Sequence, residues 1–237
     1  MKVHVPESVD EAVGLLGAGT VIAGGTHVVP RAAPTESLVS LRRAGLAGIT
    51  VQDRTVRIGA ATTLAQVGRE VEFLHAAIES IASPTIRNLA TVGGNLFVPQ
   101  PHGDLAVCLL ALDARVSIID SGGARDVGVL EATGLVTAVS FEIPERWYYT
   151  KAMRRRQNSA SIVTVASDGT RIALGGVAPR PVRATAAEAA LAEGDIAKAA
   201  ELSVEAADPF DDAYASAWYR RRVLPVHVRR ALSNHAV

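Results

Sequence analysis

The chain of 237 residues has one cysteine, few aromatic residues and no excess of either charge. Because Cys108 has no partner, the sequence can form no intrachain disulfide, no cysteine-rich zinc module and no iron–sulfur centre of its own. A reducing compartment is favoured, and we expect a cytoplasmic protein. Lysine and arginine number 24 against 24 acidic residues, which argues against a binder of nucleic acid or anionic membranes.

The sequence also lacks long apolar runs. A strongly apolar run such as residues 106–112 is far shorter than the roughly 20 residues that a membrane-spanning helix needs. The first residues include Glu7, Asp10 and Glu11 and no apolar stretch, so we expect neither a membrane span nor secretion. With 49% hydrophobic but only 4% aromatic residues, the core must consist mainly of Ala, Val, Leu and Ile.

Helical and strand patterns both occur, which predicts an α+β fold. A capping box of Ser8 and Glu11 predicts a first helix. Further helices are expected between Thr63 and Pro84, over 105–112 and in the tail from residue 185, with breaks at 208–209 and at Pro225. Strands are expected at 20–23, 38–41, 49–51, 55–58, 116–120, 135–143 and 147–151 and within 160–177. We expect residues 83–103 to form a loop.

Two glycine pairs follow short β-branched segments: Gly24–Gly25 and Gly93–Gly94. Glycines at a strand end allow successive backbone N–H groups to converge on an anionic phosphate. One such pair is more often only a tight turn, whereas two pairs suggest a ligand with two phosphates. Neither is a Rossmann fingerprint or a Walker A loop, so a nicotinamide-binding Rossmann domain and a P-loop NTPase are disfavoured.

Several longer motifs resemble one family. Residues 83–96 read SPTIRNLATVGGNL, and PHGDL at 101–105, LALDA at 110–114, FEIP at 141–144, ALGGV at 173–177, PVRAT at 181–185 and AWYRR at 217–221 follow in order. Together with the first loop at Ala23, this pattern resembles the FAD-binding medium subunit of the molybdenum hydroxylases, the family of carbon monoxide dehydrogenase and xanthine dehydrogenase. The resemblance covers nearly the whole chain.

This resemblance implies a fold and a division of the chain. It implies a PCMH-type FAD-binding domain of two α/β subdomains, at residues 1–54 and 55–145, and a C-terminal α+β domain at residues 146–237. The boundary near Pro144 also follows from the sequence, because strand signals stop there and charge density rises.

The resemblance also implies a set of cofactor-binding residues. These are expected to be Ala23, Gly24, Gly25, Thr26 and His27 in the first loop, Thr91, Gly93, Gly94 and Asn95 in the second, and Asp104 and Lys151 at the flavin end. Asp104 can equally serve as the N-cap of the helix that follows it. Ser159 stands near a position where the family often has a tyrosine over the flavin ring. A side chain at Gly94 is expected to fill the phosphate concavity and abolish FAD retention.

We assign no catalytic side chain and no metal to this chain, because a flavin carries out the redox step itself. His27 and His102 lie in the expected FAD loops but are more often ordinary loop histidines. The resemblance implies an oxidoreductase subunit that passes electrons through FAD to NAD, a quinone or another acceptor. It implies a large molybdopterin subunit and a small [2Fe–2S] subunit as partners, in a dimer of heterotrimers. The alternatives are a self-standing FAD-linked oxidoreductase and a non-catalytic assembly protein.

Overall fold

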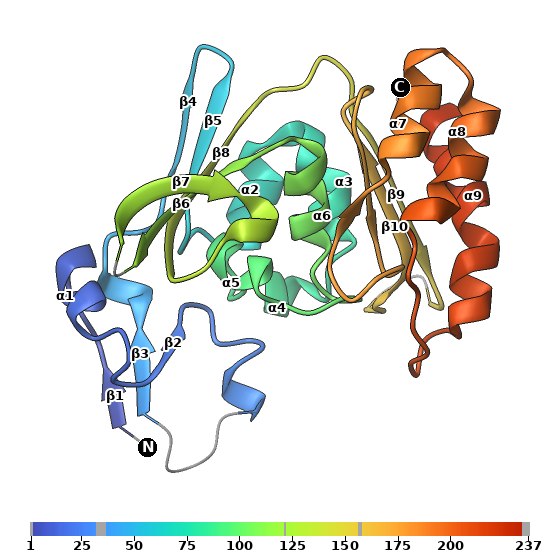
Figure 1. Ribbon diagram of the computed structural model, residues 1–237. Coiled ribbons are helices and arrows are strands. Elements are labelled where there is room, and N and C mark those ends of the chain that lie inside the picture. Colours follow the sequence, from blue (N-terminus) through green and yellow to red (C-terminus); the bar gives the residue numbers. More distant parts are fainter. Residues whose placement is uncertain (1, 32–36, 121, 156–157, 234–237) are drawn as a thin grey trace. The chain divides into compact units, whose positions relative to one another are not determined.

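The computed structural model describes residues 2–31, 37–120, 122–155 and 158–233 (Figure 1). The chain divides into two compact units that are discontinuous in sequence. Unit 1 comprises residues 1–72, 84–98 and 114–142, and unit 2 comprises residues 73–83, 99–113 and 143–237. The chain thus passes between the units several times before it reaches the C-terminal segment.

Unit 1 begins with a small sheet of three parallel strands in the order β1-β3-β2. These strands are β1 (Lys2–His4), β2 (Thr20–Ile22) and β3 (Ser37–Ser40), with α1 (Val9–Gly14) between the first two. The hydroxyl of Ser8 caps α1 by accepting from the backbone N–H of Glu11, as the sequence predicts. Short 3-10 turns, η1 (Val29–Arg31) and η2 (Leu41–Arg43), follow β2 and β3.

The larger sheet of unit 1 has the strand order β4-β5-β8-β6-β7 and is antiparallel. Its strands are β4 (Ile49–Gln52), β5 (Thr55–Gly59), β6 (Arg115–Asp120), β7 (Gly123–Gly128) and β8 (Leu135–Glu142), with η4 (Val129–Glu131) before β8. The helices of this unit are α2 (Leu64–Glu70), α4 (Pro84–Arg87) and α5 (Val92–Leu96), and η3 (Glu72–Leu74) follows α2. Helix α5 packs against β5 and β8.

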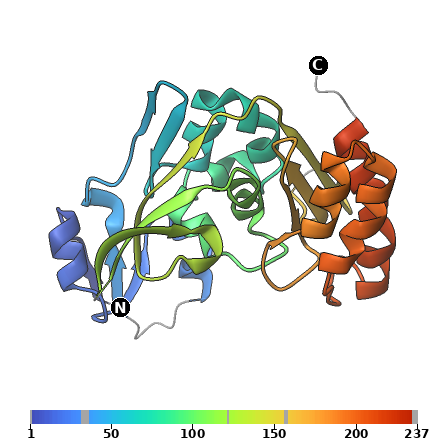
Figure 2. The same ribbon diagram turned by 45° about the horizontal axis from the view of Figure 1, so that its top comes forward.

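Unit 2 has a four-stranded antiparallel sheet in the order β12-β11-β10-β9. Its strands are β9 (Tyr148–Met153), β10 (Ser161–Ser167), β11 (Ile172–Gly175) and β12 (Val182–Arg183). Every residue of β10 is buried, because helices cover both faces of the sheet: α6 (Asp104–Ala111) and α3 (His75–Glu79) on one, and the C-terminal helices on the other (Figure 2).

The C-terminal helices are α7 (Thr185–Ala192), α8 (Ile196–Leu202) and α9 (Ala217–Ser233), with the 3-10 turn η5 (Ser203–Ala206) after α8. The fully buried Arg220 on α9 ties this layer to the sheet, because its guanidinium donates to the carbonyl oxygens of Ser161, Ile162 and Gly176. The α+β fold class that the sequence predicts is confirmed.

Two expectations about local structure are wrong. Residues 83–103 contain the short helices α4 and α5, where a loop was expected. Pro84 begins a helix, where the missing N–H of proline costs nothing. Helix α9 continues through Pro225, because the flanking Leu224 and Val228 are fully buried against the core of unit 2 and hold it there.

Candidate functional site

The first predicted glycine loop lines a cavity of about 160 Å³ in unit 1. This cavity is bounded by residues 21–28, after β2, and by residues of the segment 90–98 that includes α5. In the described part of the chain, no backbone N–H group from Gly24 to Val28 donates a hydrogen bond to a protein acceptor. Gly25 has φ +69°, the left-handed conformation that alternates with right-handed residues in anion-binding backbone nests.

Gly24 brings the two predicted loops into direct contact. A Cβ atom at Gly24 would overlap the carbonyl group of Leu89. The backbone of the first loop therefore lies against the segment that leads into α5, at a separation that only glycine permits. This contact places Ala23, Gly24, Gly25, Thr26 and His27 around one cavity with Thr91, Gly94 and Asn95.

The second glycine pair has a different role from the one expected. Gly93 and Gly94 lie in the first turn of α5, whose N-cap is Thr91, and not at the end of a strand. The N–H of Gly93 donates to the Ala60 carbonyl at 2.8 Å, and that of Gly94 to the Thr91 hydroxyl at 3.2 Å. These N–H groups are satisfied within the protein. The pair instead allows the start of α5 to lie close to Ala60, because a Cβ atom at Gly93 would be only 2.9 Å from the Cβ atom of Ala60.

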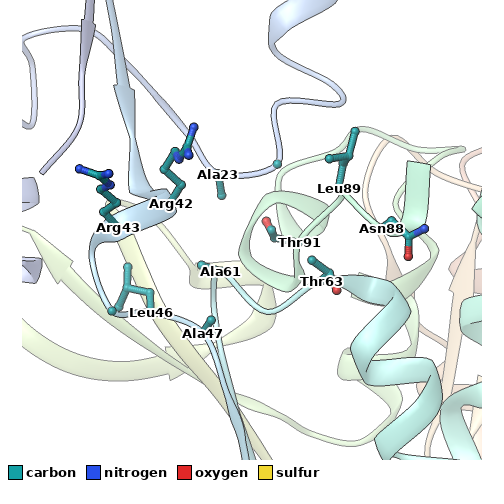
Figure 3. A pocket seen from close by; sticks show the side chains of 12 residues that line it. Ala23, Arg42, Arg43, Leu46, Ala47, Ala61, Thr63, Asn88, Leu89 and Thr91 are labelled. Carbon is teal, nitrogen blue, oxygen red and sulfur yellow. The ribbon is translucent and has the colours of Figure 1, made fainter. Parts of the chain in front are cut away.

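Two further cavities of unit 1 share lining residues with this one. A cavity of about 270 Å³ includes Gly93 and Gly94 and is walled by apolar or small residues. A cavity of about 500 Å³ has Arg42 and Arg43 on one side and Asn88, Leu89, Thr63 and Thr91 on the other (Figure 3). Ala23 lines all three cavities, so they form neighbouring compartments around the first loop.

His27 lies at the end of the first loop. Burial lowers the pKa of its imidazole below the usual value, and the nearby Arg31 lowers it further. Arg31 is also bonded to this loop, because its guanidinium donates to the His27 carbonyl at 2.8 Å. The lowered pKa favours the neutral imidazole, which can donate a hydrogen bond from one ring nitrogen and accept one at the other. In the described part of the chain, no group of histidine, cysteine and acidic residues could hold a metal ion.

Asp104 is in unit 2, at the start of α6, and its side chain is almost completely buried. It does not cap the helix; Gly103 occupies the N-cap position and makes no side-chain cap. One carboxylate oxygen instead accepts from the hydroxyls of Ser161 and Thr164 on β10, and the other from the ammonium of Lys151 at 2.8 Å. The alternative role of Asp104 as a helix cap is therefore wrong.

Lys151 on β9 completes this buried network. Its ammonium also donates to the Ser80 carbonyl at 2.8 Å, and the Ser80 hydroxyl bonds to the Tyr149 hydroxyl at 2.8 Å. Burial raises the pKa of Tyr149 well above the usual value, and the Asp104 charge raises it further. Burial likewise raises the pKa of the Cys108 thiol, so the single cysteine is an unreactive core residue.

Asp104 and Lys151 line a cavity of about 220 Å³ in unit 2. Its other lining residues are Ile81, Ala82, His102, Asn158, Ser159, Ala160 and Tyr214. His102, Ser159, Asp104 and Lys151 were all singled out in the sequence, but Tyr214 was not. No local pattern marks Tyr214, because it lies in an irregular segment that only the fold brings to this cavity.

Comparison with known proteins identifies the class of protein. A family model described as the FAD binding domain in molybdopterin dehydrogenase matches residues 1–133, and one described as the CO dehydrogenase flavoprotein C-terminal domain matches residues 147–235. The chain therefore belongs to the family of FAD-binding medium subunits of the molybdenum hydroxylases, as its motifs indicate.

Individual relatives extend over almost the whole chain. It is 32% identical to the 6-hydroxypseudooxynicotine dehydrogenase complex subunit alpha of Paenarthrobacter nicotinovorans, over 97% of this chain and 92% of the relative. It is 30% identical to the carbon monoxide dehydrogenase medium chain of Afipia carboxidovorans, over 97% and 94%. The structure of the reconstituted CO dehydrogenase from Oligotropha carboxidovorans matches with a TM-score of 0.87 at 29% identity, over 99% and 97%.

Proposed function

We propose that this chain is the FAD-binding electron-transfer subunit of a molybdenum hydroxylase complex. In this proposal, electrons come from a molybdenum centre and [2Fe–2S] clusters in a large and a small partner subunit. They leave through FAD to NAD, a quinone or another acceptor. The dimer of heterotrimers, the cytoplasmic location and the domain boundaries at residues 54 and 145 remain predictions. Within the described ranges, no helix has the length and apolar character to cross a membrane.

The observation that carries the proposal is the first loop of unit 1. Its unbonded backbone N–H groups between Gly24 and Val28 suit the oxygen atoms of a pyrophosphate, and the left-handed Gly25 suits an anion-binding nest. The cavity is bounded on its other side by Thr91, whose hydroxyl caps α5 and can still donate. We therefore propose that residues 23–27 and Thr91 hold the phosphate part of FAD. Gly94 and Asn95 line the same cavity and Gly93 allows α5 to lie close to Ala60, but the N–H groups of these three residues are bonded within the protein.

We also propose a role in FAD binding for Lys151 and Asp104, which line a separate cavity within unit 2. Lys151 offers a charged donor at a cavity wall, and Asp104 holds it in place. When bound, FAD supplies the redox chemistry by accepting and releasing two electrons. The protein binds the cofactor and orients charged and hydrogen-bonding groups around it.

Titration of the purified chain with FAD tests this proposal, with flavin absorption and fluorescence as the readouts. We expect saturable binding of one FAD per chain, and competition by ADP through the phosphate loop. Failure to bind FAD would refute the flavoprotein assignment. Co-expression with candidate large and small subunits, followed by size-exclusion chromatography, tests the complex; a chain that binds FAD but never co-elutes with them would favour the self-standing oxidoreductase.

A further inference from the structure

The cavity of unit 2 contains an aromatic side chain that the sequence comparison does not assign. Tyr214 lines this cavity together with His102, Lys151 and Ser159. The rings of Tyr214 and His102 meet edge to face, with centroids 5.6 Å apart and an interplanar angle of 82°. This arrangement fixes the orientation of the tyrosine ring, as aromatic pairs prefer.

Ser159 cannot supply a ring surface. The residue is buried and its hydroxyl donates to the neighbouring Ala160 carbonyl at 3.2 Å. The family resemblance leads us to expect an aromatic residue near this position. Since Ser159 and Tyr214 line the same cavity, an aromatic residue is present there but comes from the segment before α9.

Tyr214 is held by a chain of hydrogen bonds that leads to the core of unit 2. One Asp212 carboxylate oxygen accepts from the backbone N–H groups of Tyr214 and Ala215, at 2.8 and 3.0 Å. The other accepts from the buried Arg220 at 2.7 Å, and Arg220 is anchored to the sheet carbonyls. Burial opposes ionisation of Asp212, but these backbone and arginine hydrogen bonds outweigh it and lower its pKa.

The polar side of the same cavity has one available charged donor. The Lys151 ammonium has three protons, and Asp104 and the Ser80 carbonyl accept two of them. In the part of the chain that the structure describes, the third has no acceptor. Asp104, by contrast, already accepts hydrogen bonds from Ser161, Thr164 and Lys151, and its side chain is almost fully buried.

Ala82 adds a sign of constraint at this cavity. It has φ +47°, a left-handed conformation that is unfavourable for alanine and that the surrounding structure must impose. Such outliers are common at ligand sites. A cavity with an aromatic ring, a cationic donor and a strained wall suits a planar heteroaromatic ligand that has carbonyl oxygens at one edge.

We propose that Tyr214 is the aromatic residue that packs against the flavin ring in this chain, in place of the one that Ser159 lacks. Lys151 donates to the carbonyl edge of the ring, and Asp104 acts only as the positioning residue of Lys151. Asp212 and Arg220 position Tyr214 in turn. This inference rests on the proposed function, because the isoalloxazine ring is the planar group that FAD brings.

The test compares Tyr214→Leu with Tyr214→Phe, and uses Tyr219→Leu as a matched control, because Tyr219 is an exposed tyrosine on α9 that lines none of these cavities. We expect Tyr214→Leu to raise the Kd for FAD about tenfold, equivalent to about 1.4 kcal/mol, and to brighten bound-flavin fluorescence, since tyrosine quenches it. Tyr214→Phe should keep most of the affinity, and the control should match the wild type. ADP affinity should be unchanged in all three.

An unchanged FAD Kd and unchanged fluorescence in Tyr214→Leu would overturn the inference while leaving the flavoprotein assignment intact. Absence of FAD binding by the wild type would instead refute the proposed function. Should Tyr214→Leu not fold, Tyr214→Trp provides the second measurement, because an indole in contact with the flavin must change the absorption and quenching of bound FAD. An identical spectrum in that variant would count against contact between residue 214 and the flavin.

Asp104→Asn tests whether Asp104 positions Lys151. We expect this variant to have an altered flavin midpoint potential and an unchanged affinity for ADP.

Discussion

Gly24 and Gly94 lie in the two loops that the sequence predicts to bind FAD, and the structure gives them different reasons to lack a side chain. Gly24 lies against the Leu89 carbonyl, so any Cβ there must displace one of the two backbone segments. Gly94 is in a helical turn, and a Cβ there would meet only the Thr91 hydroxyl, at 3.0 Å. It does not have the positive φ that would by itself exclude other residues.

We therefore predict that Gly24→Ala is more damaging than Gly94→Ala. Overpacking at Gly24 should lower the free energy of unfolding by about 1–3 kcal/mol, and it should weaken FAD binding by at least an order of magnitude. Gly94→Ala should be mild, whereas Gly94→Val, whose branched side chain would extend into the cavity, should weaken binding with little loss of stability. Urea unfolding and FAD titration measure both effects. Equal damage from Gly24→Ala and Gly94→Ala would contradict this account of the loop contact.

His227 on α9 makes the stability of unit 2 depend on pH. Burial lowers the pKa of its imidazole, Arg230 lowers it further, and its Nδ1 atom is buried with no hydrogen-bond partner in the described structure. The unfolded chain, with a pKa near 6.5, thus binds the proton more readily than the folded one. Stability should fall as the pH drops below that value.

The expected result is a lower urea midpoint at pH 5.5 than at pH 7.5, and a smaller difference between the two in His227→Phe. The His27→Phe variant tests the other histidine whose pKa is lowered, in unit 1. A wild-type pH dependence in both variants would show that neither histidine is responsible.

At the scale of elements, prediction from the sequence is most accurate for an element whose residues are buried and almost all apolar. Helix α6 is predicted over 105–112 from its continuous apolar run and is observed at Asp104–Ala111, with all of its residues buried. Helices α4 and α5 were missed because four or five residues are too few to show a helical period, and their first turns depend on tertiary contacts such as that of Gly93 with Ala60. The same contacts decide that the Gly93–Gly94 pair is not a phosphate nest.

The N-terminus of α2 offers a test of element stability at the edge of the candidate site. Thr63 forms a reciprocal capping box with Gln66 and also lines the arginine-containing cavity. We expect Thr63→Ala to lower the free energy of unfolding by about 1 kcal/mol, and Thr63→Ser to restore most of it, because serine keeps the capping oxygen. Urea denaturation measures the difference. Equal stability of the alanine and serine variants would show that the cap is not what stabilises α2.

For the whole molecule, the candidate site could be predicted from the sequence only in part. The motifs identified the glycine loops, Asp104 and Lys151, because those residues are contiguous with recognisable patterns. They did not identify Tyr214 as a cavity residue, and they did not identify the hydrogen bonds that Ser161 and Thr164 donate to Asp104. Both features bring together residues that are distant in the sequence of unit 2. Cys108 is likewise buried in unit 2, where burial raises the pKa of its thiol.

The two units can be tested separately, because their aromatic residues are distributed unequally. Both tryptophans, Trp147 and Trp218, and all of the tyrosines lie in unit 2, so intrinsic fluorescence reports the unfolding of that unit, whereas calorimetry reports both. We predict that ADP, which has the phosphates but no flavin ring, stabilises unit 1, and that lumiflavin, which has the ring alone, stabilises unit 2. A ligand at 100 times its Kd adds about 2.7 kcal/mol. Because each unit has fewer than 150 residues, the corresponding rise in Tm is roughly 10 °C.

The variants provide crossed controls for this prediction. Gly24→Ala should reduce the calorimetric shift with ADP to about half or less, because a tenfold rise in Kd lowers the added free energy from about 2.7 to about 1.4 kcal/mol, and it should keep the fluorescence shift with lumiflavin. Tyr214→Leu should do the opposite. If lumiflavin protects Tyr214→Leu as well as it protects the wild type, the ring does not bind beside Tyr214. If ADP protects Gly24→Ala as well as the wild type, the phosphates do not bind in the first loop. Each result tests one cavity by itself. Adenine is planar and heteroaromatic like lumiflavin, but it has no carbonyl oxygen to accept from Lys151, so ADP should favour the cavity of unit 1.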